Sequence, residues 1–304
     1  MVAPRTSPTL EESYAACDAL ARAHYENFPV ASRLLPAGLR RHVAAVYAFA
    51  RIADDIADEP GREPAERLAL LDNWQTRLHH PSAPSAPSDL PDPSDLPDLF
   101  PALHDTIARF DLPIALFDDL LSAFRQDVTT TRYETWDDVL DYCRRSANPV
   151  GRLVLRLARQ HDEARDRWSD DICTALQLTN FWQDLAIDWA RGRLYLPDEA
   201  WLSSGASLDD LTRGAWSPAW ASVLGAAAQR TRALFVRGRP VCDAVSGRLR
   251  YELRATWHGG MRILEHLDAT GYDPFRRRPT LGRVDAVVIA WRTLAWTAGR
   301  PAVG

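Results

Sequence analysis

The chain has 304 residues, of which 46% are hydrophobic and 25% charged, enough to bury the core of one large domain or two medium ones. Its 36 basic and 41 acidic side chains give a formal net charge of −5, so the basic surface of a nucleic-acid-binding protein is not indicated. The four cysteines lie far apart without a Cys-x-x-Cys pair, which excludes a zinc knuckle or a disulfide framework and predicts buried thiols in a reducing compartment.

The helical pattern starts near residue 10 and continues through most of the chain. Ala, Leu and Arg are abundant, and no alternating run of Val, Ile or Thr between tight-turn pairs indicates a strand. We therefore predict an all-α fold, with one domain over residues 1–304. The expected helices cover residues 10–27, 37–58, 63–79, 100–110, 113–128, 135–145, 149–161, 164–191, 218–238, 240–268 and 280–297.

One low-complexity stretch, from His79 to Pro101, interrupts this pattern. It repeats Pro with Ser and Asp, so neither a helix nor a strand can propagate through it. Helical pattern of the same character continues on both sides. We therefore expect an exposed Pro/Ser/Asp-rich loop over about 79–101, inserted in one domain.

The first chemical motif lies in the segment HVAAVYAFARIADDIADE. Tyr47, Arg51, Asp54, Asp55 and Asp58 recur there at spacings of three and four residues, which places them on one helix face. Asp54 and Asp58 are separated by about 6 Å along the helix axis. Like charges at that spacing repel unless a cation intervenes, so this face is expected to bind a positive group.

The second motif lies in the segment LQLTNFWQDLAIDWARGRLYLP. Gln177, Asn180, Asp184 and Asp188 form a polar stripe through an otherwise apolar helix. Asp184 and Asp188 repeat the spacing of four residues found in the first motif. The shared spacing of the two aspartates indicates that both motifs serve one site.

The two stripes together predict a metal site. If the two helices pack side by side, four or five carboxylates line one cleft, and such hard oxygen ligands suit Mg2+ bridged by the phosphates of a substrate. Arg51 and Arg193 could bind the same diphosphate. Acidic pairs on helices are often solvated surface, but these lie among core residues such as Phe49 and Trp182, and carboxylates there need partners.

Such a site would activate a leaving group. Mg2+ neutralises the charge that develops on a departing diphosphate, which drives ionisation to an allylic or cyclopropylcarbinyl cation. The 11 Trp, 8 Tyr and 9 Phe could line an apolar tunnel that stabilises the cation and excludes water. For any single aromatic residue, Phe28 and Tyr133 included, ordinary core packing is the competing explanation.

These motifs resemble those of the squalene/phytoene synthase family, whose members join or rearrange two prenyl chains head to head. HYENFPVASRLLP resembles the opening motif of the family, and YAFARIADDIAD and QLTNFWQDLAIDWARGRLYLP resemble its two Asp-rich motifs. RYETWDDVLDYCRRSANPVG resembles the substrate-site motif between them. The resemblance implies a class I isoprenoid synthase fold, a bundle of antiparallel helices around a central cavity.

The resemblance also implies roles for individual residues. Asp54, Asp58, Asp184 and Asp188 would bind the metal and act in catalysis together with Tyr47. Two or three Mg2+ ions are expected and no NADPH, in agreement with the lack of a Gly-rich dinucleotide motif. The candidate substrate-binding residues are Phe28, Arg51, Asp55, Gln177, Asn180, Arg193 and Tyr195.

Three positions depart from the family pattern. Glu26 and Gln183 stand where the family usually has basic residues, and Arg145 stands where it has a tyrosine tied to the first condensation. These changes favour an enzyme that handles one diphosphate. The combination of the segments NFPVASRLLP, YCRRSANPVG, NFWQD and YDPFRRRP is similar to the hydroxysqualene synthase branch of bacterial hopanoid biosynthesis. That similarity implies a lyase that converts presqualene diphosphate to hydroxysqualene and releases pyrophosphate.

Two other functions stay open at this point. A head-to-head farnesyl transferase that makes presqualene diphosphate, dehydrosqualene or squalene would use the same motifs. A non-catalytic helical scaffold would carry the Asp stripes as plain surface. A ferritin-like di-iron bundle is disfavoured, because no Glu in the chain has a His three positions later.

The sequence also bears on location and partners. Without a signal-like N-terminus or a run of about 18 uncharged apolar residues, a cytoplasmic protein is expected, at most peripheral on a membrane. Arg276 to Arg278 could contact anionic lipid or cap a helix C-terminus, and Val284 to Trp291 could form a core helix or a membrane-facing one. The expected partners are a prenyl diphosphate substrate and neighbouring enzymes of the squalene pathway, with no nucleic acid.

Overall fold

The computed structural model confirms the all-α prediction. Within the described residues there is no strand, only an isolated bridge between Arg132 and Leu194. No helix in this part of the chain is long and apolar enough to cross a membrane. The structure describes residues 8–23, 37–58, 61–81 and 98–297.

The helices pack as two compact units. Unit 1 comprises residues 1–129 and 153–161, and unit 2 comprises residues 130–152 and 162–304. The division falls inside helix α7 (Asn148–Leu157). The single domain expected from the sequence stays a prediction.

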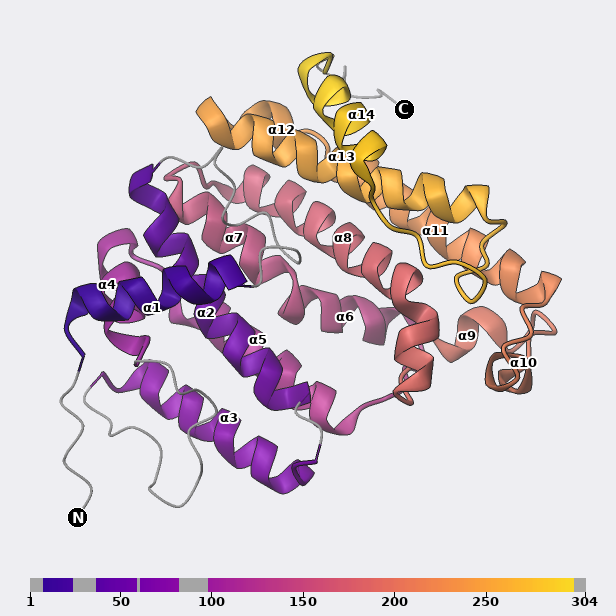
Figure 1. Ribbon diagram of the computed structural model, residues 1–304, viewed down its shortest axis with the longest axis horizontal. Helices are drawn as coiled ribbons and strands as arrows, with labels where there is room; N and C mark the ends of the chain where they lie inside the picture. The colour runs from indigo at the N-terminus through magenta and orange to yellow at the C-terminus, as the bar shows by residue number, and fades with distance from the viewer. Residues whose placement is uncertain (1–7, 24–36, 59–60, 82–97, 298–304) are drawn as a thin grey trace. The chain divides into compact units, whose positions relative to one another are not determined.

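Unit 1 is organised around Phe49 of helix α2, whose side chain is fully buried. Its ring meets Trp74 of α3 at 6.1 Å, Phe100 of α4 at 6.3 Å and Phe117 of α5 at 5.4 Å between ring centroids. This aromatic cluster fixes which side of α2 faces the core and leaves the other side for polar residues. The helices of unit 1 are α1 (Leu10–Ala23), α2 (Ala37–Asp58), α3 (Pro64–His79), α4 (Phe100–Phe110) and α5 (Ile114–Thr129) (Figure 1).

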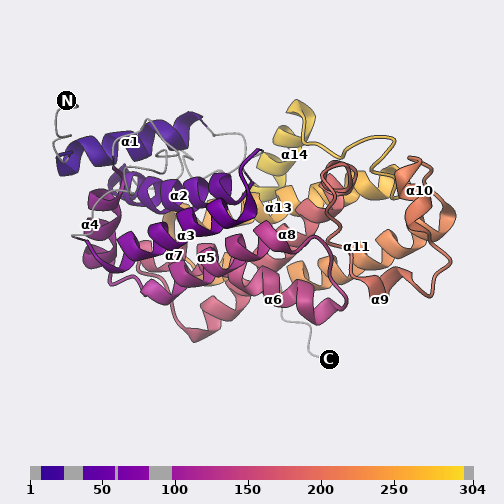
Figure 2. The ribbon, with the colours of Figure 1, turned by 90° about the horizontal axis from the view of Figure 1, so that it is seen from below.

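Unit 2 is organised around the long helix α8. Helix α11 packs along it, and α13 contacts both, as the two views of the ribbon show (Figure 2). The fully buried Trp182 of α8 donates its Nε1 hydrogen to Thr231 Oγ1 of α11 at 2.8 Å, which satisfies both polar groups inside the contact. The helices of unit 2 are α6 (Trp136–Ser146), α8 (Glu163–Ala190), α9 (Asp198–Trp201), α10 (Leu208–Thr212), α11 (Pro218–Gly238), α12 (Val241–Ala244), α13 (Gly247–Ala269) and α14 (Arg283–Leu294).

Some expected helices end elsewhere for identifiable backbone reasons. The helix expected over 240–268 is broken into α12 and α13, because Gly247 at their junction has a left-handed φ of 63°. The helix expected over 149–161 ends at Leu157, two residues before Arg159, which has a φ of 54°. The short helices α9 and α10 were not anticipated.

Two further expectations concern chain segments that are only partly described. The first expected helix ends at Ala23, and residues 24–27 of it lie outside the described residues. Helix α3 ends at His79 and α4 begins at Phe100, as expected on either side of the Pro-rich loop, while residues 82–97 lie outside the described residues. All four cysteines are free, and three are buried, with Cys173 half-buried.

Adjacent glycines in α13 give a direct test of this packing. A Cβ on Gly260 would lie 2.3 Å from Phe235 Cζ and 3.0 Å from Leu176 Cδ2, whereas a Cβ on Gly259 would meet only Leu281 at 3.9 Å. We expect Gly260→Ala to lower the free energy of unfolding by about 1–3 kcal/mol through overpacking. Gly259→Ala should raise it by about 0.5–1 kcal/mol through helix propensity. Denaturant unfolding of both variants checks this, and equal effects would contradict the described approach of α13 to α11 and α8.

Candidate active site

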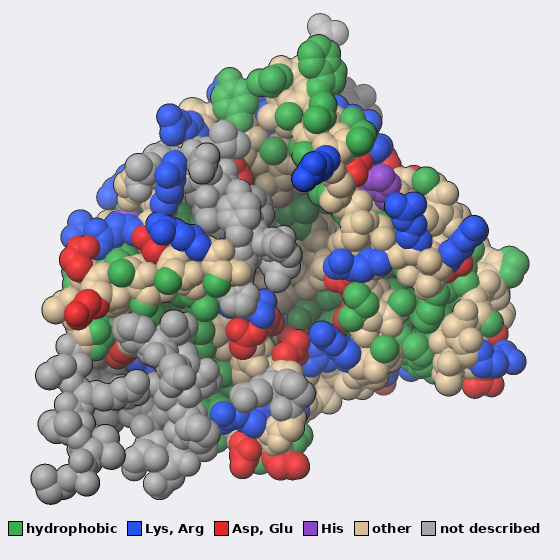
Figure 3. Space-filling model, in the orientation of Figure 1, with side chains coloured by type: hydrophobic (Ala, Val, Ile, Leu, Met, Phe, Trp, Pro, Cys, Tyr) green, Lys and Arg blue, Asp and Glu red, His purple; other side chains and the backbone are tan. Residues whose placement is uncertain are grey.

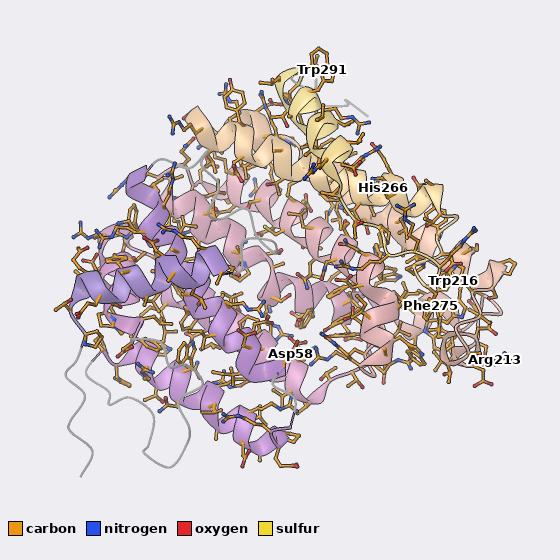
Figure 4. The ribbon with its side chains drawn as sticks, viewed as in Figure 1. Asp58, Arg213, Trp216, His266, Phe275 and Trp291 are labelled. Carbon is orange, nitrogen blue, oxygen red and sulfur yellow. The ribbon has the colours of Figure 1, made fainter. Side chains whose placement is uncertain are left out.

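The predicted motif residues of α2 are those that its packing leaves accessible. Asp55 and Asp58 are exposed, and Tyr47, Arg51 and Asp54 are half-buried. The positions between them, such as Ile52, Ala53 and Ile56, are buried in unit 1. Asp58 lies at the C-terminal end of α2 (Figure 4). The first Asp-rich stripe is thus anchored by the core of unit 1.

Within this stripe, Arg51 is already paired along the helix. Its Nε and Nη2 donate to the two oxygens of Asp55 at 3.0 and 2.6 Å, a bidentate ion pair at the favourable spacing of four residues. Burial lowers the pKa of Arg51, but the hydrogen bond and the charges of Asp55 and Asp54 outweigh it and raise the pKa. Arg51 therefore stays charged, as a phosphate ligand must.

Tyr47 lies one turn before Arg51 on α2. Burial raises the pKa of the Tyr47 phenol, and the nearby carboxylates of Asp55 and Asp54 add to the effect, while Arg51 opposes it. The phenol therefore remains protonated at neutral pH. It can donate a hydrogen bond but cannot act as a general base.

The second stripe, on α8, converges on the carboxylate of Asp184. Asn180 Nδ2 donates to Asp184 Oδ2 at 2.9 Å, and Arg278 Nε donates to Asp184 Oδ1 at 2.5 Å. The Asp184 side chain is only 17% exposed, so this arginine offsets a charge that would otherwise be costly to bury. Both carboxylate oxygens of a predicted metal ligand thus have a partner within unit 2.

Arg278 is the residue that the sequence interpretation missed. Neither of the two roles considered for the arginines at 276–278 describes it, because its side chain pairs with Asp184 on a helix 94 residues earlier. Gln183 holds the segment in place by donating from Nε2 to the Pro279 carbonyl at 2.6 Å. Gln183 stands where the family usually has an arginine, and here it positions the chain that carries Arg278.

The end of α8 places the remaining predicted residues. Asp188 accepts the backbone N–H of Arg193 at 2.8 Å through its carbonyl oxygen, and Gly192, with a φ of 80°, makes the turn between them. Leu194 then donates its N–H to the Thr131 carbonyl at 2.9 Å. This short pairing carries Arg193, half-buried, and Tyr195, buried, away from α8 in a fixed direction.

Tyr195 belongs to a cluster of aromatic rings beside the stripe. Its ring stacks on Phe181 with the centroids 3.8 Å apart and the planes within 2°. Tyr133 lies 5.7 Å and Tyr142 5.8 Å from Tyr195. Phe181 is three residues before Asp184, so the ring cluster and the carboxylate project from the same part of α8.

The departure at Arg145 has a local explanation. The Arg145 guanidinium contacts Asp141 Oδ2 at 2.9 Å along α6 and is 13% exposed, and Arg144 contacts the other oxygen of Asp141 at 2.8 Å. These two arginines lower the pKa of the Asp141 carboxyl, although burial acts in the opposite direction. The residue that replaces the family tyrosine therefore serves an ion pair on its own helix.

The donors suit magnesium by their chemistry. Asp54 and Asp58 of unit 1, and Asp184 and Asp188 of unit 2, supply only hard oxygen atoms, one helical turn apart in each pair. Within the described residues, no three His, Cys, Asp or Glu side chains gather as a metal-binding group. Phe28, the remaining predicted substrate contact, lies outside the described residues.

The all-α fold is that of the isoprenoid synthases. The sequence profile of squalene/phytoene synthases matches residues 21–285. The chain is 34% identical to a hydroxysqualene synthase of Sinorhizobium fredii over 92% of its own length and 91% of that protein, and 35% identical to one of Zymomonas mobilis over 88% and 86%. The chain therefore belongs to the squalene/phytoene synthase family.

Solved structures agree with this assignment. The squalene synthase HpnC of Alicyclobacillus acidocaldarius matches with a TM-score of 0.77 and 38% identity, over 87% of this chain and 96% of that one. A dehydrosqualene synthase in complex with a ligand matches with a TM-score of 0.78 at 22% identity, over 94% and 97%, which supports the fold alone. The predicted isoprenoid synthase fold is thereby confirmed.

The anchoring of the segment 276–279 can be tested by proteolysis. Gln183→Ala removes the hydrogen bond to the Pro279 carbonyl, which is worth about 1 kcal/mol, so opening of the segment should become about fivefold more frequent. We expect trypsin to cleave after Arg276 and Arg277 faster by that factor, as measured by mass spectrometry. Gln177→Ala on the same stripe is the matched control and should cleave at the wild-type rate. Equal rates in all three proteins would mean that Gln183 does not hold the segment.

Proposed function

We propose that the chain ionises presqualene diphosphate, rearranges the resulting cation and lets water capture it, giving hydroxysqualene and pyrophosphate. The observation that carries the proposal is the 34–35% identity to three hydroxysqualene synthases over 88–92% of the chain. The departures at Gln183 and Arg145 point the same way. In the overall change, the C–O bond to diphosphate breaks with both electrons leaving on oxygen, water forms the new C–O bond, and one proton is released.

Asp54, Asp58, Asp184 and Asp188 are the proposed ligands of Mg2+. Bound Mg2+ would neutralise the charge that develops on the leaving diphosphate. The pairing of Asp184 with Arg278 supports this role, because a cation already occupies that carboxylate. An arginine beside a metal-binding carboxylate can transfer its donors to a phosphate oxygen when the metal takes over the carboxylate. Arg278 joins Arg51 and Arg193 as a proposed diphosphate contact.

The neutral groups of the site would govern the hydrocarbon part of the reaction. Asn180 orients the Asp184 carboxylate, and the protonated phenol of Tyr47 can donate to a leaving oxygen. The aromatic cluster around Phe181 and Tyr195 would help to stabilise a nearby carbocation and to exclude water until it reacts. No reductant is needed, because the product is an alcohol.

The alternative function is the head-to-head condensation of two farnesyl diphosphates. It is favoured by the name squalene synthase of the 38% identical structure and by the 29% identity to the 15-cis-phytoene synthase of Synechococcus elongatus. The two functions share the Asp stripes but differ in substrate. They therefore separate in a substrate test.

The proposed reaction makes a specific isotopic prediction. Purified protein given presqualene diphosphate and Mg2+ in 18O-labelled water should form hydroxysqualene that carries 18O, because the C–O bond of the substrate breaks and water supplies the new oxygen. Farnesyl diphosphate alone should not be converted. Mass spectrometry of the products measures both. Unlabelled presqualene alcohol would indicate a phosphatase, and squalene or presqualene diphosphate made from farnesyl diphosphate would indicate the condensing enzyme.

The metal ligands make a second prediction. Asp54→Asn or Asp184→Asn should each reduce kcat on the order of 100-fold or more, since each removes a charge that holds the diphosphate-neutralising metal. Calorimetric titration with Mg2+ and pyrophosphate should show weaker binding in both variants. Asp209→Asn, an exposed carboxylate in the first turn of α10, is the control. Wild-type turnover in the two site variants would favour a scaffold whose Asp stripes are plain surface.

A further inference from the structure

Helix α14 of unit 2 presents an apolar side to solvent. Val284, Val287, Trp291 and Leu294 recur every three or four residues on one side of the helix and are between 69% and 74% exposed. Leu281, just before the helix, extends this apolar stripe and is 45% exposed. Figure 3 shows hydrophobic side chains gathered over α14, and in Figure 4 Trp291 points away from the ribbon. A contiguous apolar surface of this kind marks an interaction site.

The polar side of the same helix is turned inward against α13. The buried carboxylate of Asp285 accepts hydrogen bonds from Arg262 Nε at 2.6 Å and His266 Nε2 at 2.8 Å. Arg292 pairs with Glu265 of α13 at 2.6 Å. These bonds fix the rotation of α14, since turning the apolar side inward would leave buried charges without partners. The exposure of the stripe is therefore built into the fold.

Arginines without acidic partners lie next to the stripe. Arg276, Arg277 and Arg283 are exposed, and within the described part of the chain none of them pairs with a carboxylate. The stretch from residue 276 to 297 contains five arginines and a single acidic residue, Asp285, although the whole chain has a net charge of −5. The apolar stripe is thus bordered by local positive charge.

We propose that this surface docks on an anionic lipid bilayer, with the stripe in the outer acyl region and the arginines at the headgroup phosphates. Twelve residues of helix are about 18 Å long, too short to span a bilayer but suited to lying in its interface. Trp291 has the amphipathic ring that favours this depth. A second copy of the chain fits less well, because symmetric pairing of the stripes would bring the same unpaired arginines together. The inference does not depend on the proposed reaction.

Vesicle flotation tests the proposal directly. The full-length protein is mixed with vesicles of phosphatidylcholine alone, or with vesicles that also contain about 30% phosphatidylglycerol. The second composition gives a roughly physiological negative surface charge. We expect flotation with the anionic vesicles and a decrease with salt. Val287→Ser/Trp291→Ser should weaken the partition coefficient roughly tenfold or more. Arg276→Gln/Arg283→Gln should weaken it for the anionic vesicles only.

A matched variant controls for general loss of surface hydrophobicity. Leu202→Ser removes an apolar side chain of unit 2 that is 65% exposed and directly follows α9, outside the stripe of α14, and it should float like the wild type. Thermal melts establish that every variant is folded. Absence of flotation by the wild type, or equal flotation of the α14 and control variants, would overturn the proposal. A wild-type dimer in size-exclusion chromatography that Val287→Ser/Trp291→Ser dissociates, without lipid binding, would assign the stripe to a second copy instead.

Discussion

The structure around the candidate site in unit 2 depends on balancing the negative charge of the Asp184 carboxylate. It projects from a helix whose opposite side is buried, so its charge must be balanced from within the unit. The balance comes from Asn180 on the same helix and from Arg278 on a distant segment. The Arg278 contact in turn requires that the segment 276–279 lie on α8, and Gln183 secures it there. The half-buried Asp184 is thus bonded to a segment far along the sequence.

The sequence predicted what depends on local periodicity. The helical positions of the Asp pairs and most of the helix bounds follow from spacing and composition. The partner of Asp184 could not be predicted in this way. The sequence does not distinguish the three consecutive arginines, and only tertiary packing brings Arg278 to Asp184. The break before α13 depends on a positive φ at Gly247. A glycine within a helical pattern does not by itself predict that conformation.

The finer function depends on a few side chains in a shared framework. The match to the family covers most of the chain, so it establishes the family and not the product. The informative positions are Gln183 and Arg145, where a phosphate-facing cation and a tyrosine are replaced by groups that bond to the protein itself. Side chains engaged in this way are less available to a second diphosphate. A reaction with one diphosphate is therefore favoured.

The lipid-facing helix and the candidate site are joined by a very short connection. Pro279 is tied to α8 through Gln183, and Gly282 donates its N–H to Asp285 at the start of α14 at 2.8 Å. Three residues of chain span at most about 10 Å, so α14 cannot move far without breaking one of these bonds. Arg278, one residue before Pro279, is therefore held close to the start of α14 by this short connection.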